Sequence, residues 1–416
     1  MKSDIFDDNL TKINLKEKNI KYLFAIQMVL ATFAPIIFIA NILGFDIAIS
    51  FLTMGLSTLI FYYVSNKKVP VMLESSELYV LTMIGIMHNE GLGALKTGIL
   101  STACVYFIMS FLVNKINRKI LVKVFSPLVV SSLVMLTGIK TSFEVLEMLD
   151  FSNGIINIKS LILLIVVLFT FIFLSTKKTI IKYVSIFISI LVGYIVALSL
   201  GMVNFTPITN AKIIGFSEQA INYLSVKPVF SLNAIISMGF IAILSIIDHV
   251  VDIQTIGTLT ENDYAKDPGY KKTIFGEGIS NFISAIFLSP PKNITDESIS
   301  VLILSKFYDP SLIKISSIIL IILSFFGKLM GFLQTIPHEV IGAIAIILAG
   351  ATICLGIEMF IKNKVNFADE RNIIILSVTF VLGIAIDHLN FFGISLSGIS
   401  IAMITNVILN SLMSEK

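Results

Sequence analysis

The sequence predicts an all-α polytopic membrane protein with fourteen transmembrane spans, arranged as two inverted repeats of seven. Hydrophobic residues make up 56% of the 416 residues and charged residues 14%, with a mean hydropathy of +0.94, whereas soluble domains carry about 25% charged residues. Apolar runs reach the ~20 residues that a helical span requires. Basic residues gather in alternate connections, as they do in the cytoplasmic loops of multi-pass proteins.

The apolar segments are separated by short polar connections. Segments 78–88 and 297–307 hold only about 11 residues each, or roughly 16 Å of helix, and each follows a proline-containing stretch, at Pro70 and at Pro290-Pro291. We therefore expect spans 3 and 10 to be a short strand plus a half-helix. The fourteen segments are 22–42, 47–64, 78–88, 92–113, 126–146, 159–175, 181–202, 230–252, 274–287, 297–307, 311–331, 337–361, 372–387 and 394–413.

The orientation follows from the basic residues. Residues 1–21 are polar and lack the pattern of a cleaved signal peptide, so we expect a cytoplasmic N-terminal tail. The even connections then lie inside and hold most of the lysines and arginines of the connections, and only Lys212 and Lys227, in the long connection 203–229, break the pattern. We therefore predict a cell membrane protein with both termini in the cytoplasm.

The two halves show a faint internal repeat. Pro70 precedes LESSELYV in the first half, and Pro291 precedes ITDESISV in the second; later, Pro127 and Pro337 each open an apolar span. Seven spans per half is an odd number, so the second copy enters the membrane from the opposite face. Paired broken spans in such inverted repeats indicate the position of a binding site.

Several functional classes lack support in the sequence. The net charge of +3 is small and forms no basic patch, so no nucleic-acid partner is expected. Cys104 and Cys354 stand alone in apolar runs, which argues against disulfides and thiolate metal sites. We find no phosphate-binding loop and no nucleophile–base or metal set, so we predict no enzyme activity and no cofactor.

The stretch Leu288–Lys306, LSPPKNITDESISVLILSK, carries the strongest functional signal. Prolines forbid a continuous helix there, and Asp296 and Glu297 stand where the next helix begins. A carboxylate inside a span costs at least ~2.5–3.5 kcal/mol on insertion scales, so its first interpretation is functional. Acids at or near membrane depth are Glu74, Glu77, Asp248, Asp252, Asp296 and Glu297.

Two of these acids share one helical face. Asp248 and Asp252 are four residues apart, and His249 beside them is a candidate proton relay, although a buried histidine is also a common structural residue. The positive end of its half-helix favours the anionic form of Glu297. Asp296 could instead cap that helix. A small planar molecule with alternating N–H and C=O groups fits carboxylates and free helix N–H groups, and so does a cation.

The chain resembles the uracil/xanthine permeases, the nucleobase–cation symporter family that includes the nucleobase–ascorbate transporters. The resemblance begins near Tyr22 and is most specific around the broken span. The stretches that carry it are 189–208 (SILVGYIVALSLGMVNFTPI), 245–257 (SIIDHVVDIQTIG), 266–308, 326–344 (FGKLMGFLQTIPHEVIGAI) and 372–385.

The resemblance implies a core domain, 22–113 (spans 1–4) and 209–331 (spans 8–11), and a gate domain, 114–208 (spans 5–7) and 332–416 (spans 12–14). It implies that a nucleobase is held between them by Asp248 and Glu297, with Asp296 and Glu77 also facing the base. It further implies a homodimer in the lipid bilayer and proton symport, for which Asp248, Asp252, His249 and Glu297 are the candidate residues.

The chain departs from the family pattern at the site. Asp248 replaces the usual Glu of span 8, and Asp252 replaces a His four residues later. Glu77 stands where the family brings an aromatic residue, although Tyr79 is near. Ser298 and Ser300 replace an Asn-x-Gly pattern, and Lys21-Tyr22 replace Gln-His.

These changes make the site more acidic than is usual in the family, so a cation-coupled transporter of another small polar solute is an alternative. The other alternative within transport is an anion exchanger or channel of the same 7+7 fold, which the acidic pair Asp296-Glu297 disfavours. An embedded enzyme would need a nucleophile–base or metal set, and we find none. A sensor would need an extra soluble domain, and we expect none. We expect a nucleobase importer with Asp248, Glu297, Asp296, Glu77, Tyr79 and Ser298 at the substrate.

Overall fold

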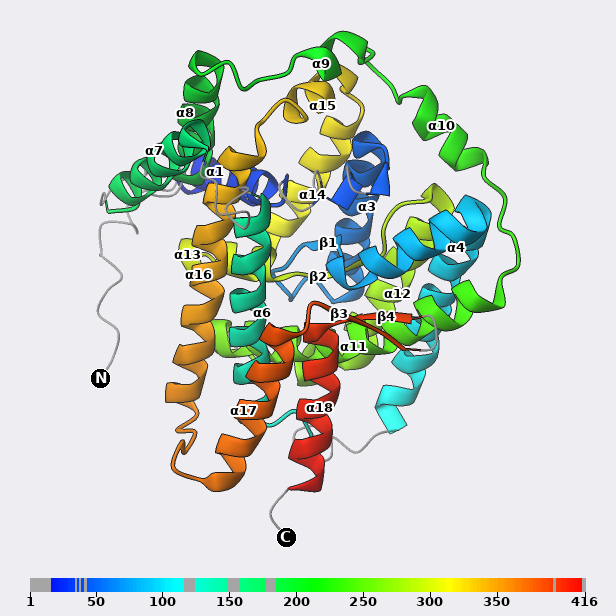
Figure 1. Cartoon of the computed structure of the whole chain (residues 1–416), viewed down its shortest axis with the longest axis vertical. Helices are drawn as coiled ribbons and strands as arrows, with labels where there is room; N and C mark the ends of the chain where they lie inside the picture. The colour runs from blue at the N-terminus through cyan, green and yellow to red at the C-terminus, as the bar shows by residue number, and fades with distance from the viewer. Residues whose placement is uncertain are drawn as a thin grey trace.

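The computed structural model describes residues 16–33, 36, 39–40, 43–115, 124–148, 157–176, 185–391 and 394–413. The predicted N-terminal tail falls almost wholly outside these residues. Helices dominate the described chain (Figure 1), and each predicted apolar segment contains at least part of one. The helices are α1 (Lys16–Ala31), α3 (Ile47–Val64), α4 (Val80–Leu112), α6 (Pro127–Met148), α7 (Ile158–Ser175), α8 (Ser185–Ser199), α9 (Thr206–Asn210), α10 (Glu218–Ser225), α11 (Leu232–Thr260), α12 (Tyr270–Phe287), α13 (Asp296–Ser305), α14 (Ser311–Ser324), α15 (Gly327–Leu333), α16 (His338–Lys362), α17 (Glu370–Ala385) and α18 (Gly398–Leu412).

Length and composition alone qualify five of the described helices to cross a membrane, or six if α14 and α15 count as one broken span. Those two helices bend by 105° at their break, so predicted span 311–331 is not the straight helix its apolar run indicated. Shorter apolar helices lie at Pro127–Phe143, Ile188–Ser199 and Gly398–Leu412. The number of spans, fourteen, remains a prediction.

Helix α7 is apolar on its exposed face as well as on its buried face. Of its 18 residues only Ser160, Leu163, Val167 and Phe171 are buried, a stripe of three- and four-residue spacing that faces the protein. The opposite face is apolar too: Phe169 is 69% exposed and Ile165 56% exposed. An extended apolar outer face of this kind is expected against lipid.

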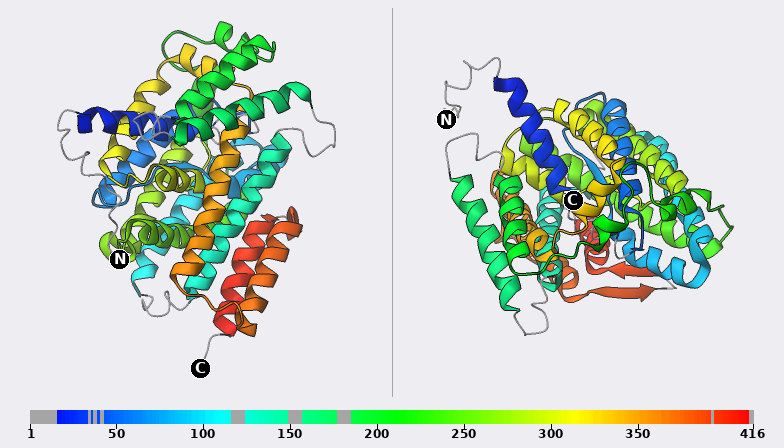
Figure 2. Two further views of the ribbon diagram at one scale, coloured as in Figure 1. Left: turned by 90° about the vertical axis from the view of Figure 1, so that its left-hand side faces the viewer. Right: turned by 90° about the horizontal axis from the view of Figure 1, so that it is seen from above.

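The helices pack in two groups. Helices α3, α4, α11, α12 and α14 contact one another, and a second group joins α6 with α16 and α17, α17 with α18, and α7 with α8 and α16. Figure 2 shows α6, α16, α17 and α18 as roughly parallel rods, while α11 crosses them in Figure 1. Contacts of α13 with α16 and of α11 with α6 and α18 connect the two groups.

Two short strands pair near the centre of the molecule (Figure 1). Strand β1 (Leu73–Ser75) runs antiparallel to β2 (Lys292–Ile294), with Leu73 opposite Ile294 and Ser75 opposite Lys292. The 3₁₀ turn η1 (Glu77–Tyr79) and α4 follow β1, and the ten-residue α13 follows β2. Both segments therefore consist of a short strand followed by a helix, as expected, and their role as broken membrane spans remains a prediction.

The first half-helix ends at a glycine. Gly91 lies within α4 at φ 80° and ψ 178°, a left-handed conformation that glycine adopts without a side-chain clash. The run from Val80 to the break corresponds to the short segment predicted at 78–88, and the rest of α4 to the span predicted at 92–113. Sequence reasoning placed this boundary correctly between the two segments.

A second pair of strands was not predicted. Strand β3 (His388–Phe391) pairs antiparallel with β4 (Ile394–Ser397), whereas 388–390 was expected to be a loop and 394 the start of the last span. The residues LNF and ISL alternate in a way that suits a strand, and α18 begins only at Gly398.

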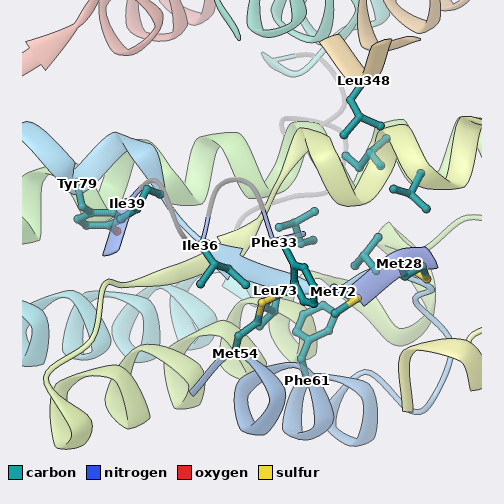
Figure 3. Close-up of a cluster of buried hydrophobic side chains, with 14 of the residues drawn as sticks. Met28, Phe33, Ile36, Ile39, Met54, Phe61, Met72, Leu73, Tyr79 and Leu348 are labelled. Carbon is teal, nitrogen blue, oxygen red and sulfur yellow. The ribbon is translucent and has the colours of Figure 1, made fainter. Parts of the chain in front are cut away.

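The strand pair is seated in an apolar core. Met72 and Leu73 are 0% exposed, as are Met54 and Phe61 of α3, and Figure 3 shows these side chains together with Phe33 around the strand. Within the described part of the chain, β1 and β2 form a two-stranded sheet, so backbone groups of these segments that face away from the pair need other partners.

Candidate functional site

Side chains from two helices, α3 and α13, hold the first strand and the residue before it. The backbone N–H of Leu73 donates to Thr58 Oγ1 at 3.0 Å, and the Thr58 hydroxyl donates to the Leu73 carbonyl at 3.3 Å. The N–H of Met72 donates to Ser298 Oγ at 2.9 Å. Ser298, predicted to bind substrate, thus lies in α13 with its hydroxyl on β1, where it ties the two broken spans together.

Helix α12 holds the second strand. Asn281 Oδ1 accepts a hydrogen bond from the N–H of Lys292 at 2.7 Å, and Glu277 Oε1 accepts one from the N–H of Ile294 at 3.1 Å. Both side chains are 0% exposed. Because Asn281 and Glu277 are four residues apart, they point from the same helical face and grip alternate residues of the strand.

A lysine is buried where β1 pairs with β2, a place that we call the crossing. Lys292 is 0% exposed, and its Nζ donates to Ser75 Oγ at 2.7 Å. The carboxylate of Glu74, also 0% exposed, interacts electrostatically with this ammonium group. Buried charges are tolerated when they are compensated and hydrogen-bonded, and Glu74 is the acid of the first strand that can offset a charge on Lys292.

A polar cluster joins the first half-helix to α11. Tyr106 donates to Ser245 Oγ at 2.8 Å, and Asn293 Nδ2 donates to the same oxygen at 3.4 Å. Tyr79 is 1% exposed and interacts with both Ser245 and Tyr106. Tyr79, expected at the substrate, therefore lies beside the hydrogen-bonded cluster around Ser245, about one helical turn from Asp248.

Helix α11 carries the acids predicted in span 8. Asp248 is half-buried, while Asp252 is 4% exposed, and each takes part in polar or electrostatic interactions. The carboxylate of Asp248 acts electrostatically on Tyr106. Helix α11 packs against η1, β2 and α13, so the span that bears Asp248 does meet both broken spans.

The acids of the broken spans are placed by their backbones alone. Asp296 and Glu297 are the first two residues of α13, directly after extended Thr295, and Glu77 is the first residue of η1. Their side chains lie outside the described part of the structure. The helix start at Asp296 supplies first-turn N–H groups that lack intrahelical partners, as the sequence predicted.

His249 faces away from solvent and toward α12. Its Nδ1 lies 2.8 Å from Glu277 Oε1, and its Nε2 lies 2.8 Å from Thr273 Oγ1; His249 and Glu277 are both fully buried. Sequence reasoning found His249 but missed Glu277, because segment 274–287 was treated as uniformly apolar. The acid in IFGEGIS met the same criterion as the six acids that were selected.

Lys292 and Tyr106 were also missed. A lysine two residues after Pro290 in a broken span was readable in the sequence, whereas nothing in the apolar run that contains Tyr106 marks that residue. Their contacts join segments more than a hundred residues apart, and such pairs are invisible without coordinates.

Paired broken spans, half-helix starts and carboxylates on a crossing helix define a polytopic membrane carrier. Residues 20–390 match the family model Xan_ur_permease, described as "Permease family". The chain belongs to this permease family, as the resemblance indicated, and is a transporter rather than an enzyme.

Relatives span nearly the whole chain. The probable uracil permease of Haemophilus influenzae is 30% identical over 392 residues, covering 94% of this chain and 93% of that protein. The uracil permease of Bacillus subtilis is 25% identical over 403 residues, covering 94% of this chain and 92% of that protein.

Solved structures share the fold. SLC26A9 matches with a TM-score of 0.65 at 13% identity, covering 97% of this chain and 66% of that chain. The transmembrane domain of the cyanobacterial bicarbonate transporter BicA matches with a TM-score of 0.55 at 12% identity, covering 96% and 98%. At these identities the likeness supports the architecture alone.

Proposed function

We propose that this permease is a secondary active transporter that imports a nucleobase, uracil or a purine such as xanthine, by proton symport. The observation that carries the proposal is the central crossing: two strands pair at the break of two spans, and α13 begins with Asp296 and Glu297 while packing against the helix of Asp248. The uracil permeases among the relatives support the class of substrate.

The chemistry of the site suits a nucleobase. Ionised Asp248 and Glu297 accept hydrogen bonds from ring N–H groups, and the unpaired first-turn N–H groups of α13 donate to ring carbonyls. We assign Asp296, Glu77 and Tyr79 to the same pocket, with Ser298 holding its wall. Irregular backbone at membrane depth is tolerated where it lines such a cavity.

The two packing groups suggest how transport proceeds. We assign helices α3, α4, α11, α12 and α14 to a core domain and α6, α7, α8, α16, α17 and α18 to a gate domain, corresponding to residues 22–113 with 209–331 and 114–208 with 332–416. Movement of the core against the gate then exposes the site to each side in turn. We further propose fourteen spans in two inverted repeats, a homodimer, and cytoplasmic termini in the cell membrane.

Uptake of radiolabelled uracil by proteoliposomes tests the proposal. We expect Glu297→Gln and Asp248→Asn each to lower uptake at least about tenfold, because each removes a charge-assisted hydrogen bond of roughly 1.5–3 kcal/mol. Asp309→Asn is the control, since Asp309 pairs with Lys21 at 2.5 Å beyond Ser305, at the opposite end of α13 from Asp296 and Glu297. Full uptake in both site variants, or wild-type uptake indifferent to a proton gradient, contradicts the proposal.

One observation favours a second candidate, an anion exchanger. Lys292 places a buried basic side chain at the crossing, and the fold is that of SLC26A9 and BicA. Thermal stabilisation across pyrimidines, purines, bicarbonate and sulfate, at two pH values, separates the candidates. Stabilisation by an inorganic anion and by no base would select the exchanger.

A further inference from the structure

The strongest buried contact not assigned to the site joins α11 to α12. His249 and Glu277 are both 0% exposed, and 2.8 Å separates Nδ1 from Oε1. Glu277 Oε2 accepts no hydrogen bond within the described part of the chain. An acid and a base removed together from water form a natural place to hold a proton.

The hydrogen bonds around His249 fit two protonation states. The Thr273 hydroxyl has one proton and two acceptors within reach, His249 Nε2 at 2.8 Å and the Tyr270 carbonyl at 3.2 Å. A neutral imidazole accepts that proton at Nε2, whereas an imidazolium donates at Nε2 and the hydroxyl turns to the carbonyl. Adding a proton therefore leaves Nε2 hydrogen-bonded in either state.

The contact between Nδ1 and Glu277 depends on charge. The two atoms are close, but the N–H direction is not aligned with the carboxylate oxygen as a hydrogen bond requires. An unaligned contact gains little from hydrogen bonding and much from opposite charges in a poorly solvated interior. Protonation of His249 thus strengthens the link between α11 and α12.

Other ionisable groups surround this pair. Tyr79 of η1 and Tyr106 of α4 both interact electrostatically with Glu277. On α11 the carboxylates of Asp248 and Asp252 stand one residue before and three residues after His249. Lys292 of β2 and the acids that begin α13 are further charged groups on the packed elements.

The pair is also connected to both ends of the proposed substrate site. Glu277 Oε1 accepts the N–H of Ile294, the last residue of β2, two residues before Asp296. His249 directly follows Asp248 on α11. Glu277 Oε1 therefore contacts both His249, which neighbours Asp248 on α11, and the backbone of β2, which leads to Asp296 and Glu297.

We propose that His249 and Glu277 bind the transported proton, and that Glu277 is the positioning residue that transmits this protonation to β2. This rests on the proposed proton-coupled uptake of a nucleobase. With the proton bound, the imidazolium draws Glu277 to α11 and holds β2 in register beside Asp248. When the proton leaves, the clamp weakens and the start of α13 is freed to release its substrate.

The test compares proteoliposomes of wild type, Glu277→Gln and His249→Gln. Glutamine at 277 keeps an acceptor for Ile294 but removes the charge. We expect an inward proton gradient to raise wild-type uracil uptake at least about fivefold, and to raise that of either variant by less than about twofold, with uracil counterflow still measurable. Asn281→Ala is the matched control, because it removes the other strand anchor without changing charge; it should slow uptake and keep the gradient response.

The outcomes separate this inference from the proposed function. Wild-type uptake that ignores the gradient, or the absence of any uracil flux, overturns the proposed function itself. A gradient response preserved in both variants overturns the role of this pair alone. If Glu277→Gln abolishes all flux, Glu277→Asp decides: a folded aspartate variant that recovers the gradient response supports the inference, and one that does not overturns it.

Discussion

Among single residues, Lys292 is the one that most changes the electrostatics of the crossing. It is wholly buried, donates to Ser75, and interacts with the carboxylate of Glu74. Removing one partner of a buried ion pair costs about 3–5 kcal/mol, because the other charge is left uncompensated, whereas removing both is often nearly neutral. The energetic value of Lys292 therefore depends on whether Glu74 is present.

This dependence gives a prediction. Lys292→Met should lower the melting temperature and reduce uracil uptake at least about tenfold, and Glu74→Gln added to it should restore stability and at least part of the uptake. Melting curves and uptake of the three variants make up a double-mutant cycle. A double variant no better than Lys292→Met would show that Lys292 acts on something other than Glu74, such as an anionic substrate.

The limits of sequence reasoning are clearest for residues. His249, Asp248 and Asp252 were found because helical spacing and the cost of charge in a span single them out. Glu277 was missed because one acid hardly lowers the hydropathy of a 14-residue segment. Its contact with His249 joins positions on different helices, so its importance follows from packing and not from local pattern.

Two helices are coupled at the kink of α4. Glu90, just before Gly91, accepts hydrogen bonds from Asn233 Nδ2 at 2.7 Å and from Ser231, and Ser231 caps the start of α11. The bonds from Asn233 and Ser231 lower the pKa of the Glu90 carboxyl. This exposed acid thereby fastens the end of the first half-helix to the helix that bears Asp248.

The sign of the pH effect follows from that shift. A lowered pKa in the folded state means that Glu90 contributes stability above the ordinary glutamate pKa of about 4.3, and that this contribution is lost as the pH falls through the lowered value. Glu90→Gln should therefore melt at a lower temperature than wild type at pH 7, with the difference shrinking as the pH falls through the lowered pKa.

The control for this prediction is Glu261→Gln, which alters an exposed acid at the opposite end of α11 and should melt like wild type throughout that pH range. A Glu90→Gln deficit that does not shrink as the pH falls would mean that the carboxylate charge contributes nothing.

At the level of elements, prolines and segment lengths predicted most of the fold. Pro70 and Pro290-Pro291 located both strands, and the short runs after them located both half-helices. The bend between α14 and α15 was not predictable, because the run through Phe325 and Phe326 stays apolar and the 105° turn is set by tertiary packing. The β3–β4 hairpin was missed because its apolar residues read as the start of a span.

For the whole molecule, the basic residues yield a testable topology. Lys67 and Lys227 are both exposed, but we place Lys67 in the cytoplasm and Lys227 outside. In a background with Cys104→Ser and Cys354→Ser, a cysteine at 227 should react with a membrane-impermeant maleimide in intact cells. A cysteine at 67 should react only after lysis, and equal labelling at both positions in intact cells would contradict the inverted arrangement.

The pairing of β1 with β2 also determines when the chain can finish folding. The first strand ends at Ser75, and its partner ends at Ile294, so more than two hundred residues are synthesised between them. Until β2 is made, backbone N–H and C=O groups of β1 lack their hydrogen-bond partners, and lipid cannot supply others. The newly made N-terminal half must therefore wait in a sheltered, hydrated setting within the insertion machinery, and the two halves become a stable unit only once the second break has emerged from the ribosome.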